Sequence, residues 1–85
     1  MNILEQNCKM LTIEEFKQLW ACPITHEVPL DPVVIADGFT YERAAIETWL
    51  AIKQTSPMTN ELLQNTRVTP NRAALRIIAL FGLRD

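Results

Sequence analysis

The chain has 85 residues, a formal net charge of −2 and a pI near 5.3, which is enough for one compact domain and too little for two. Hydrophobic residues make up 48% and charged residues 21%, a globular composition that excludes an extended disordered chain. The basic residues are scattered, which argues against nucleic-acid binding, and no apolar run approaches the ~20 residues of a membrane span.

The N-terminal part carries one helix pattern. Thr12 and Glu15 fit a capping box, in which each side chain accepts a hydrogen bond from the other residue's backbone N–H. Phe16 and Trp20 follow at helical spacing. The pattern predicts a short helix from about Ile13 to Trp20, and the alternative is a loop that only anchors the two aromatic rings on the core.

A β-hairpin is predicted next. Three prolines between residues 23 and 32 make that stretch a loop. The β-branched run at residues 33–36 and the run at 39–41 flank Asp37-Gly38, a pair suited to a two-residue type I′ turn.

A central helix is expected from about Tyr41 to Lys53. Ile46, Trp49 and Leu50 lie at i, i+3 and i+4, the spacing of one buried helical face. Ser-Pro at residues 56–57 ends this helix and opens a second loop.

The last third predicts a short third strand at residues 67–68 and a closing helix that Pro70 and Asn71 open and Gly82 ends. Its apolar stripe consists of Ala74, Leu75, Ile78 and Phe81. No internal repeat is evident. The expected fold is a small α+β domain over residues 12–85, preceded by a flexible segment at 1–11. It has a hairpin-based three-stranded sheet, a central helix, two loops flanking that helix and a C-terminal helix.

Residues 22–50 read CPITHEVPLDPVVIADGFTYERAAIETWL. The Cys-Pro-Ile-Thr opening, the Asp-Pro-Val before the first strand, the Gly-x-Thr-Tyr-Glu-Arg entry into the helix and the Ile-x-x-Trp-Leu within it resemble the U-box pattern. Ser-Pro-Met-Thr at 56–59 and Pro-Asn at 70–71 resemble its second loop and closing helix. The resemblance covers about residues 16–81, and the order and spacing of the fragments make it specific.

The resemblance implies a zinc-free relative of the RING fold. Such domains are modules of ubiquitin ligases: they dock a ubiquitin-charged conjugating enzyme and promote transfer of ubiquitin to a substrate lysine, with no covalent intermediate on the domain. The residues agree about metal, because Cys8, Cys22 and His26 cannot supply the four ligands that each of two zinc ions requires. A single site completed by water is the alternative. We therefore expect no cofactor and no metal, and Cys22 is expected to be a small buried residue.

If no metal holds the loops, polar side chains must hold them. Glu27 and Arg43 are one candidate ion pair. Asn71 matches a family asparagine that ties a loop to the last helix, although a plain N-cap role explains it equally well and one amide can do both. For the other members the alternative is a solvated surface group. The predicted network consists of Thr25, Glu27, Asp37, Tyr41, Arg43, Thr59 and Asn71.

The resemblance also places the conjugating enzyme against the two loops and the central helix. Its contacts would be Ile24, His26, Trp49, Pro57 and Asn60. Ile24 and Trp49 have a core role as their alternative, and Pro57 has the role of a helix stop.

Two of these residues depart from the family pattern. His26 stands where many relatives have an apolar or aromatic contact, and Asn60 stands where several have a basic residue. A degenerate U-box that binds proteins without ligase activity is therefore the second reading.

A further reading is a dimerisation or scaffold unit, in which the apolar end at residues 79–81 and the N-terminal aromatic residues pair two copies into a homodimer. With few cysteines and no signal peptide pattern, a reducing, cytoplasmic location is expected, and the nucleus or the cytosol of a host cell is the alternative.

Overall fold

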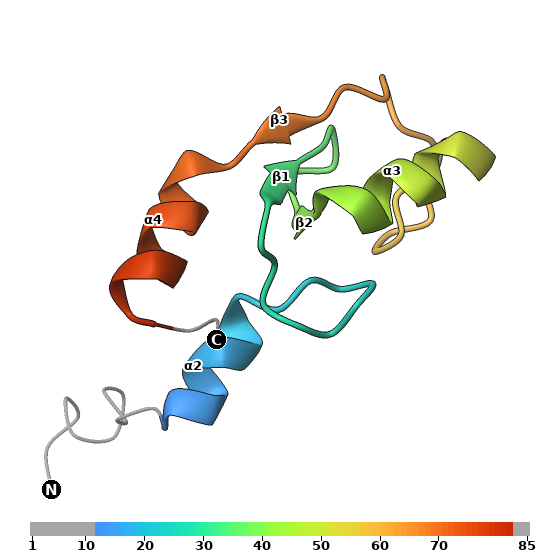
Figure 1. Cartoon of the computed structure of the whole chain (residues 1–85). Helices are drawn as coiled ribbons and strands as arrows, with labels where there is room; N and C mark the ends of the chain where they lie inside the picture. Colours follow the sequence, from blue (N-terminus) through green and yellow to red (C-terminus); the bar gives the residue numbers. More distant parts are fainter. Residues whose placement is uncertain (1–11, 83–85) are drawn as a thin grey trace, which may run out of the picture.

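The computed structural model describes residues 12–82, and the flexible segment predicted at 1–11 lies outside that range (Figure 1). The three strands form one sheet of order β2-β1-β3, and both pairings are antiparallel. The small α+β fold with a three-stranded sheet is thereby confirmed. The elements are α2 Ile13–Leu19, β1 Pro32–Val34, β2 Thr40–Glu42, α3 Arg43–Ile52, β3 Thr69–Pro70 and α4 Arg72–Leu80.

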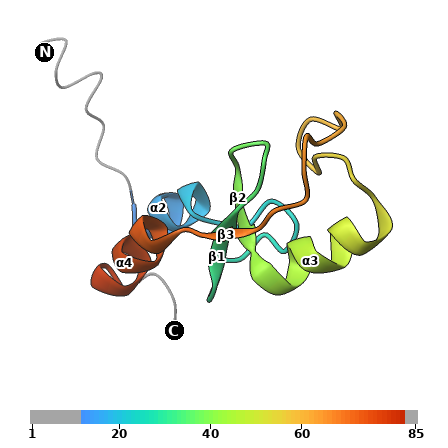
Figure 2. The same cartoon turned by 90° about the horizontal axis from the view of Figure 1, so that it is seen from above.

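The sheet separates two ends of the molecule. Helices α2 and α4 lie beside each other at one end, and α3 lies with both loops at the other (Figures 1 and 2). None of the helices described within residues 12–82 is long and apolar enough to span a membrane.

Helix α2 begins at the predicted capping box. The Glu15 N–H donates to Thr12 Oγ1 at 3.1 Å and the Thr12 N–H donates to Glu15 Oε1 at 3.2 Å. Phe16 and Trp20 pack against Val28 and Ile78. The helical reading of this segment is therefore confirmed.

The turn of the hairpin differs from the prediction. Val33 pairs with Tyr41 and Val34 with Thr40, so the connection is five residues long, 35–39, and the predicted two-residue turn is wrong. A type I′ turn needs positive φ at both central residues, and of the Asp-Gly pair only Gly38 has it, at 82°. The Gly38 N–H instead donates to the Ile35 carbonyl at 2.9 Å, which closes a turn over residues 35–38.

Strand β2 ends at Glu42, one residue beyond the predicted run, and α3 begins at Arg43 and not at Tyr41. Tyr41 is wholly buried in the strand, and this burial holds the segment extended. Strand β3 lies at residues 69–70, not at the predicted 67–68, and Pro70 pairs with Val33. Pro70 therefore ends a strand, and Asn71 alone caps α4.

The core has two parts. The main cluster consists of Cys22, Val33, Ile35, Tyr41 and Ile46, and Ile24 and Trp49 pack against its edge. The second cluster lies between α2 and α4 and contains Val28 and Ile78 with Phe16 and Trp20.

The predicted apolar stripe of α4 is only half correct. Ala74 and Ile78 are buried, whereas Leu75 and Phe81 are exposed. Phe81 meets Phe16 edge to face at 5.4 Å between ring centroids. Leu75 of α4 and Phe81 just after its end therefore expose apolar surface to solvent.

Candidate functional site

The two loops beside α3 share one backbone design. Loop 1 is residues 22–27 (CPITHE) and loop 2 is residues 56–61 (SPMTNE). In loop 1 the Cys22 N–H donates to the Glu27 carbonyl at 2.8 Å, and the His26 N–H donates to the Cys22 carbonyl at 2.7 Å. Loop 2 makes the same two bonds between its first, fifth and sixth residues, both at 2.8 Å. Each loop is therefore closed at its base by its own backbone.

Side chains at matched positions also make matched bonds. The N–H of the third residue donates to the side chain of the first, Cys22 Sγ at 3.4 Å and Ser56 Oγ at 3.1 Å. The N–H of the sixth residue donates to the threonine at the fourth, Thr25 Oγ1 at 3.2 Å and Thr59 Oγ1 at 3.3 Å. The six-residue similarity is an internal repeat that the sequence analysis did not identify, and its signal is the pattern [Cys/Ser]-Pro-[Ile/Met]-Thr-[His/Asn]-Glu.

His26 and Asn60 occupy the fifth position of the two loops. Both have left-handed backbone conformations, with φ of 62° and 65°. Asparagine tolerates this region better than most residues, and a bulkier side chain there costs free energy. Both residues are exposed at the loop tips, so the backbone conformation of each loop sets where its fifth side chain projects.

Asp37 joins loop 2 to the hairpin. Its Oδ2 accepts hydrogen bonds from the Tyr41 hydroxyl and from the Ser56 hydroxyl, each at 2.7 Å, and its Oδ1 accepts from the Phe39 N–H at 2.9 Å. Ser56 is 1% exposed and was missed by sequence reasoning. Burial and then the contact with Asp37 raise the pKa of Tyr41, so Tyr41 acts as a neutral donor.

Asn71 performs two roles at once. Its Oδ1 accepts from the Ala74 N–H at 3.1 Å as the N-cap of α4, and its Nδ2 donates to Thr40 Oγ1 at 2.9 Å. The second bond reaches strand β2 and not a loop. Thr40, its partner, was not among the predicted residues.

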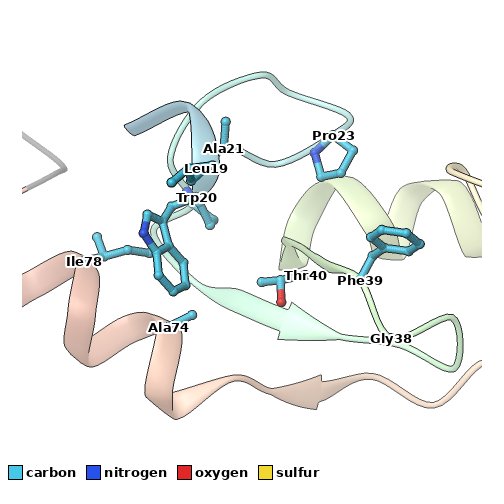
Figure 3. A pocket seen from close by; sticks show the side chains of 10 residues that line it. Leu19, Trp20, Ala21, Pro23, Gly38, Phe39, Thr40, Ala74 and Ile78 are labelled. Carbon is cyan, nitrogen blue, oxygen red and sulfur yellow. The ribbon is translucent and has the colours of Figure 1, made fainter. Parts of the chain in front are cut away.

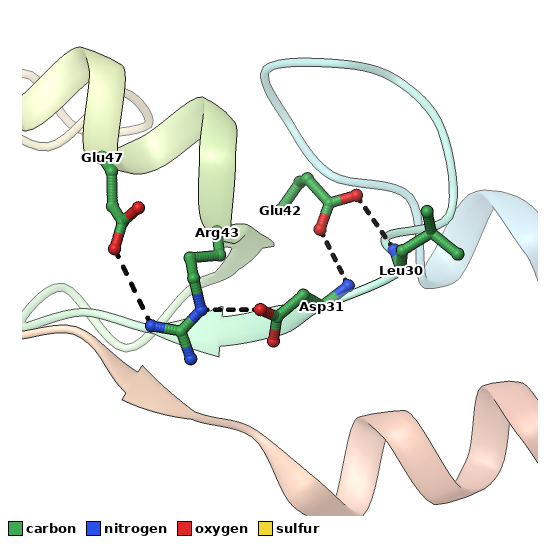
Figure 4. A network of polar contacts seen from close by, with 5 residues as sticks. All are labelled: Leu30, Asp31, Glu42, Arg43 and Glu47. Atoms are coloured by element: carbon green, nitrogen blue, oxygen red, sulfur yellow. Dashed lines mark hydrogen bonds and ion pairs between the residues drawn. The ribbon is translucent and has the colours of Figure 1, made fainter.

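Arg43 does not pair with Glu27, and that predicted ion pair is wrong. Its Nε lies 2.6 Å from Asp31 Oδ2 and its Nη1 lies 3.8 Å from Glu47 Oε2 (Figure 4). These contacts raise the pKa of Arg43, with the Asp31 hydrogen bond as the main cause. Arg43 is the first residue of α3 and follows Glu42 directly. Because Glu42 pairs with Pro32 in the sheet, the Arg43 guanidinium lies close to Asp31.

Glu42 holds the segment before β1 by a separate contact. Its carboxylate accepts from the Leu30 N–H at 3.0 Å and from the Asp31 N–H at 2.8 Å (Figure 4). Backbone N–H groups just before a short strand have no partner within the sheet, and a carboxylate is a strong acceptor for them. This bridge fixes the exit of the proline-rich segment against the start of α3.

Trp49 lies on α3 between the loops. It is partly buried, and its Nε1 donates to the Thr55 carbonyl at 2.6 Å. The Lys53 ammonium lies 5.0 Å from the centroid of the indole ring, within the range of a cation–π contact. Lys53 was not predicted as a site residue.

Ile24 of loop 1, Trp49 of α3 and Pro57 of loop 2 are all partly exposed apolar residues. Ile24 and Trp49 pack on the same core cluster. His26 and Asn60 lie at the two loop tips. Among the described residues, 12–82, no group of three or more His, Cys, Asp or Glu side chains is arranged to hold a metal ion.

Apart from this site, a hollow of about 270 Å³ lies between the end of α2, the hairpin and α4. In Figure 3 the Trp20 ring stands over Ala74 and beside Ile78, with Phe39 across the hollow. The Trp20 Nε1 is buried and has no hydrogen-bond partner. Apart from Thr40, the hollow is lined by apolar residues, and it carries none of the predicted site residues.

Known proteins are similar to this chain in sequence. A sequence model of the U-box domain matches residues 14–82. The WD repeat, SAM and U-box domain-containing protein 1 of Danio rerio is 51% identical over 73 residues, which is 74% of this chain and 15% of that protein. U-box domain-containing protein 37 of Arabidopsis thaliana is 53% identical over 60 residues, 69% of this chain and 15% of that protein. The chain thus spans about 15% of the length of these two relatives, and it belongs to the U-box family.

Proposed function

We propose that this domain docks a ubiquitin-charged conjugating enzyme and promotes transfer of ubiquitin to a substrate lysine. U-box domains are generally modules of ubiquitin ligases. The observation that carries the proposal for this chain is the arrangement of Ile24, Trp49 and Pro57, which offer a partly exposed apolar centre on two hydrogen-bonded loops and one helix. Interfaces commonly take their energy from such central anchors within a polar rim.

The role proposed for the domain is positional. No side chain of the site is set up as a nucleophile, since Cys22 is wholly buried and a reactive thiol needs access to solvent. The domain holds the charged enzyme so that a substrate amine can attack the thioester, and the gain comes from proximity and orientation. Ubiquitin would be contacted near Asn60, at the tip of loop 2. A cytoplasmic location is part of the proposal, because the free Cys22 thiol fits a reducing compartment.

The test is discharge of a ubiquitin-loaded conjugating enzyme to free lysine, across a panel of enzymes, with and without the domain. We expect acceleration with at least one enzyme, and its loss in Ile24→Ala. Ile13→Ala is the matched control, because Ile13 is an exposed aliphatic residue on α2, away from the loops. Full activity of a folded Ile24→Ala protein would refute the docking site.

A second function, protein binding without ligase activity, is favoured by the two loop tips. His26 replaces an apolar or aromatic contact of many relatives, and Asn60 brings no positive charge to loop 2. Absence of both binding and acceleration with every enzyme of the panel, for a domain shown to be folded, would support this function. We also propose that two copies of the domain pair through the apolar end at residues 79–81, where Leu80 and Phe81 are exposed.

A further inference from the structure

Lys53 is a cation beside the candidate site that has no ion pair in the described part of the chain. Between residues 22 and 61, which contain both loops and α3, lysine and arginine occur only as Arg43 and Lys53. Arg43 makes both of the ion pairs found among residues 12–82, so its charge is committed to them. Lys53 is exposed. Its positive charge is therefore available to a partner at this end of the molecule.

The end of α3 places Lys53 one turn after Trp49. Lys53 is the C-cap of the helix, and its N–H donates to the Trp49 carbonyl at 2.8 Å. Residues four apart lie on one side of a helix, and the Lys53 ammonium lies 5.0 Å from the centroid of the indole ring, where the negative face of the ring attracts it. The helix dipole also favours a cation here, but the dipole alone does not direct the ammonium to the ring.

The indole ring beside Lys53 is itself fixed. Its Nε1 donates to the Thr55 carbonyl at 2.6 Å, and the ring packs on the main core cluster while part of it stays exposed. Because hydrogen bonding and packing both set the orientation of the ring, the ammonium is held at a defined edge of the candidate site.

This position makes the charge matter to any partner that contacts Trp49. A partner that covers the exposed part of the ring also removes water from the neighbouring ammonium. Such desolvation costs free energy unless an opposite charge replaces the water. A carboxylate of the partner would compensate the loss, whereas a lysine or arginine there would add repulsion. The same cation therefore favours one kind of partner and disfavours the other.

We propose that Lys53 is a specificity-determining residue of the docking surface. It selects conjugating enzymes that carry a carboxylate beside their apolar patch, and it rejects enzymes that carry a lysine or arginine there. This inference rests on the docking function proposed above and adds a charge rule to it. Contacts with Ile24 and Pro57 are common to all the enzymes, and Lys53 discriminates between them.

The first test measures the dissociation constants of a panel that contains both kinds of enzyme. Lys53→Glu should weaken binding of the carboxylate-bearing enzymes roughly tenfold and strengthen binding of the basic ones. Lys53→Arg should keep the wild-type order, because a guanidinium retains the charge and also stacks on an indole ring. Arg76→Glu is the matched control: it makes the same change in net charge at an exposed position of α4, at the other end of the molecule (Figure 1), and should alter neither group.

The second test exchanges charges across the interface. In a carboxylate-bearing enzyme, replacement of that carboxylate by lysine should weaken binding to the wild-type domain and restore binding to Lys53→Glu. Salt should weaken the wild-type complex more than the complex of Lys53→Met, which keeps an apolar stem and loses the charge. In the discharge reaction, Lys53→Glu should raise the KM for the loaded enzyme and leave kcat unchanged, because the contact serves binding alone.

The outcomes separate this inference from the docking function. If enzymes bind the domain and their order of affinity is the same for the wild type and Lys53→Glu, the charge rule is overturned and docking stands. If the exchanged pair fails to recover its affinity, Lys53 does not meet that carboxylate and the rule is likewise overturned. If no enzyme of the panel binds the folded wild-type domain, the docking function itself fails, and the charge rule fails with it.

Discussion

The Ser56 hydroxyl donates a hydrogen bond to the Asp37 carboxylate at 2.7 Å, and this contact joins loop 2 to the hairpin across 19 residues of sequence. The same oxygen of Ser56 accepts from the N–H groups of Met58 and Thr59. Ser56 therefore both shapes its loop and attaches it to the sheet, so the position of Pro57 depends on a hydroxyl that is almost wholly buried.

Ser56→Ala is expected to lower the free energy of unfolding by roughly 1–3 kcal/mol, because the two loop N–H groups and Asp37 each lose a buried partner. Chemical denaturation monitored by tryptophan fluorescence measures the change. Thr66→Ala, at an exposed position of the long connection to β3, is the control and should change stability by less than ~0.5 kcal/mol. Equal stability of the Ser56→Ala protein would contradict the role assigned to the hydroxyl.

Asn71→Ala should destabilise the domain by roughly 1–3 kcal/mol, since it removes the N-cap of α4 and the donor to Thr40 together. Asn71→Asp keeps the cap and loses only the donor, so its loss should be smaller. Thermal unfolding ranks the two variants. If Asn71→Asp proves as damaging as Asn71→Ala, the bond to Thr40 carries most of the stabilisation.

The raised pKa of Tyr41 predicts that the domain loses stability at alkaline pH. Burial, followed by the contact with Asp37, raises the pKa of Tyr41 above its ordinary value of 10.0. Above that pH the unfolded chain releases the phenolic proton while the folded chain retains it. The stability contributed by Tyr41 is therefore complete below pH ~10 and falls by up to ~1.4 kcal/mol per pH unit above it.

Tyr41 is the only tyrosine of the chain, so tyrosinate absorbance reports it directly. We expect ionisation and alkaline unfolding to coincide. In Tyr41→Phe the decline of stability above pH ~10 should be shallower. Ionisation near pH 10 in a protein that is still folded would show that the hydroxyl is not held as the structure indicates.

The positive φ of His26 predicts that substitution by glycine maintains or raises the free energy of unfolding. Its φ of 62° is free of cost for glycine and unfavourable for a β-branched residue. His26→Gly should match or exceed the wild-type stability, whereas His26→Val should lose about 1–2 kcal/mol. The same pair of changes at Asn60 should span a smaller range on the glycine side, because asparagine already tolerates this conformation. A more stable His26→Val protein would be the contrary result.

Local patterns predicted the helices well. The capping box at Thr12 and Glu15 and the N-cap at Asn71 depend only on residues three positions away, and both formed as expected. The hairpin turn was predicted wrongly because Asp37 is committed to Tyr41 and Ser56, and those partners lie further along the chain. The conformation of an Asp-Gly pair follows from such contacts as much as from its propensity.

The candidate site shows the same limit. Glu27 was paired with Arg43 on charge alone, whereas the register of β1 and β2 brings Asp31 to Arg43. Ser56 escaped notice because a single serine has no distinctive spacing. Alignment of loop 1 with loop 2 would have identified it as the counterpart of buried Cys22.

Each of the two hexapeptide loops is closed at its base by its own backbone hydrogen bonds, so the two loops can be exchanged as units. Since the backbone bonds at the first, fifth and sixth positions close either loop, the side chain at the third position, Ile24 in loop 1 and Met58 in loop 2, can vary while the frame stays constant. A chain built this way can change the partner it recognises through a few substitutions, and it need not redesign its core.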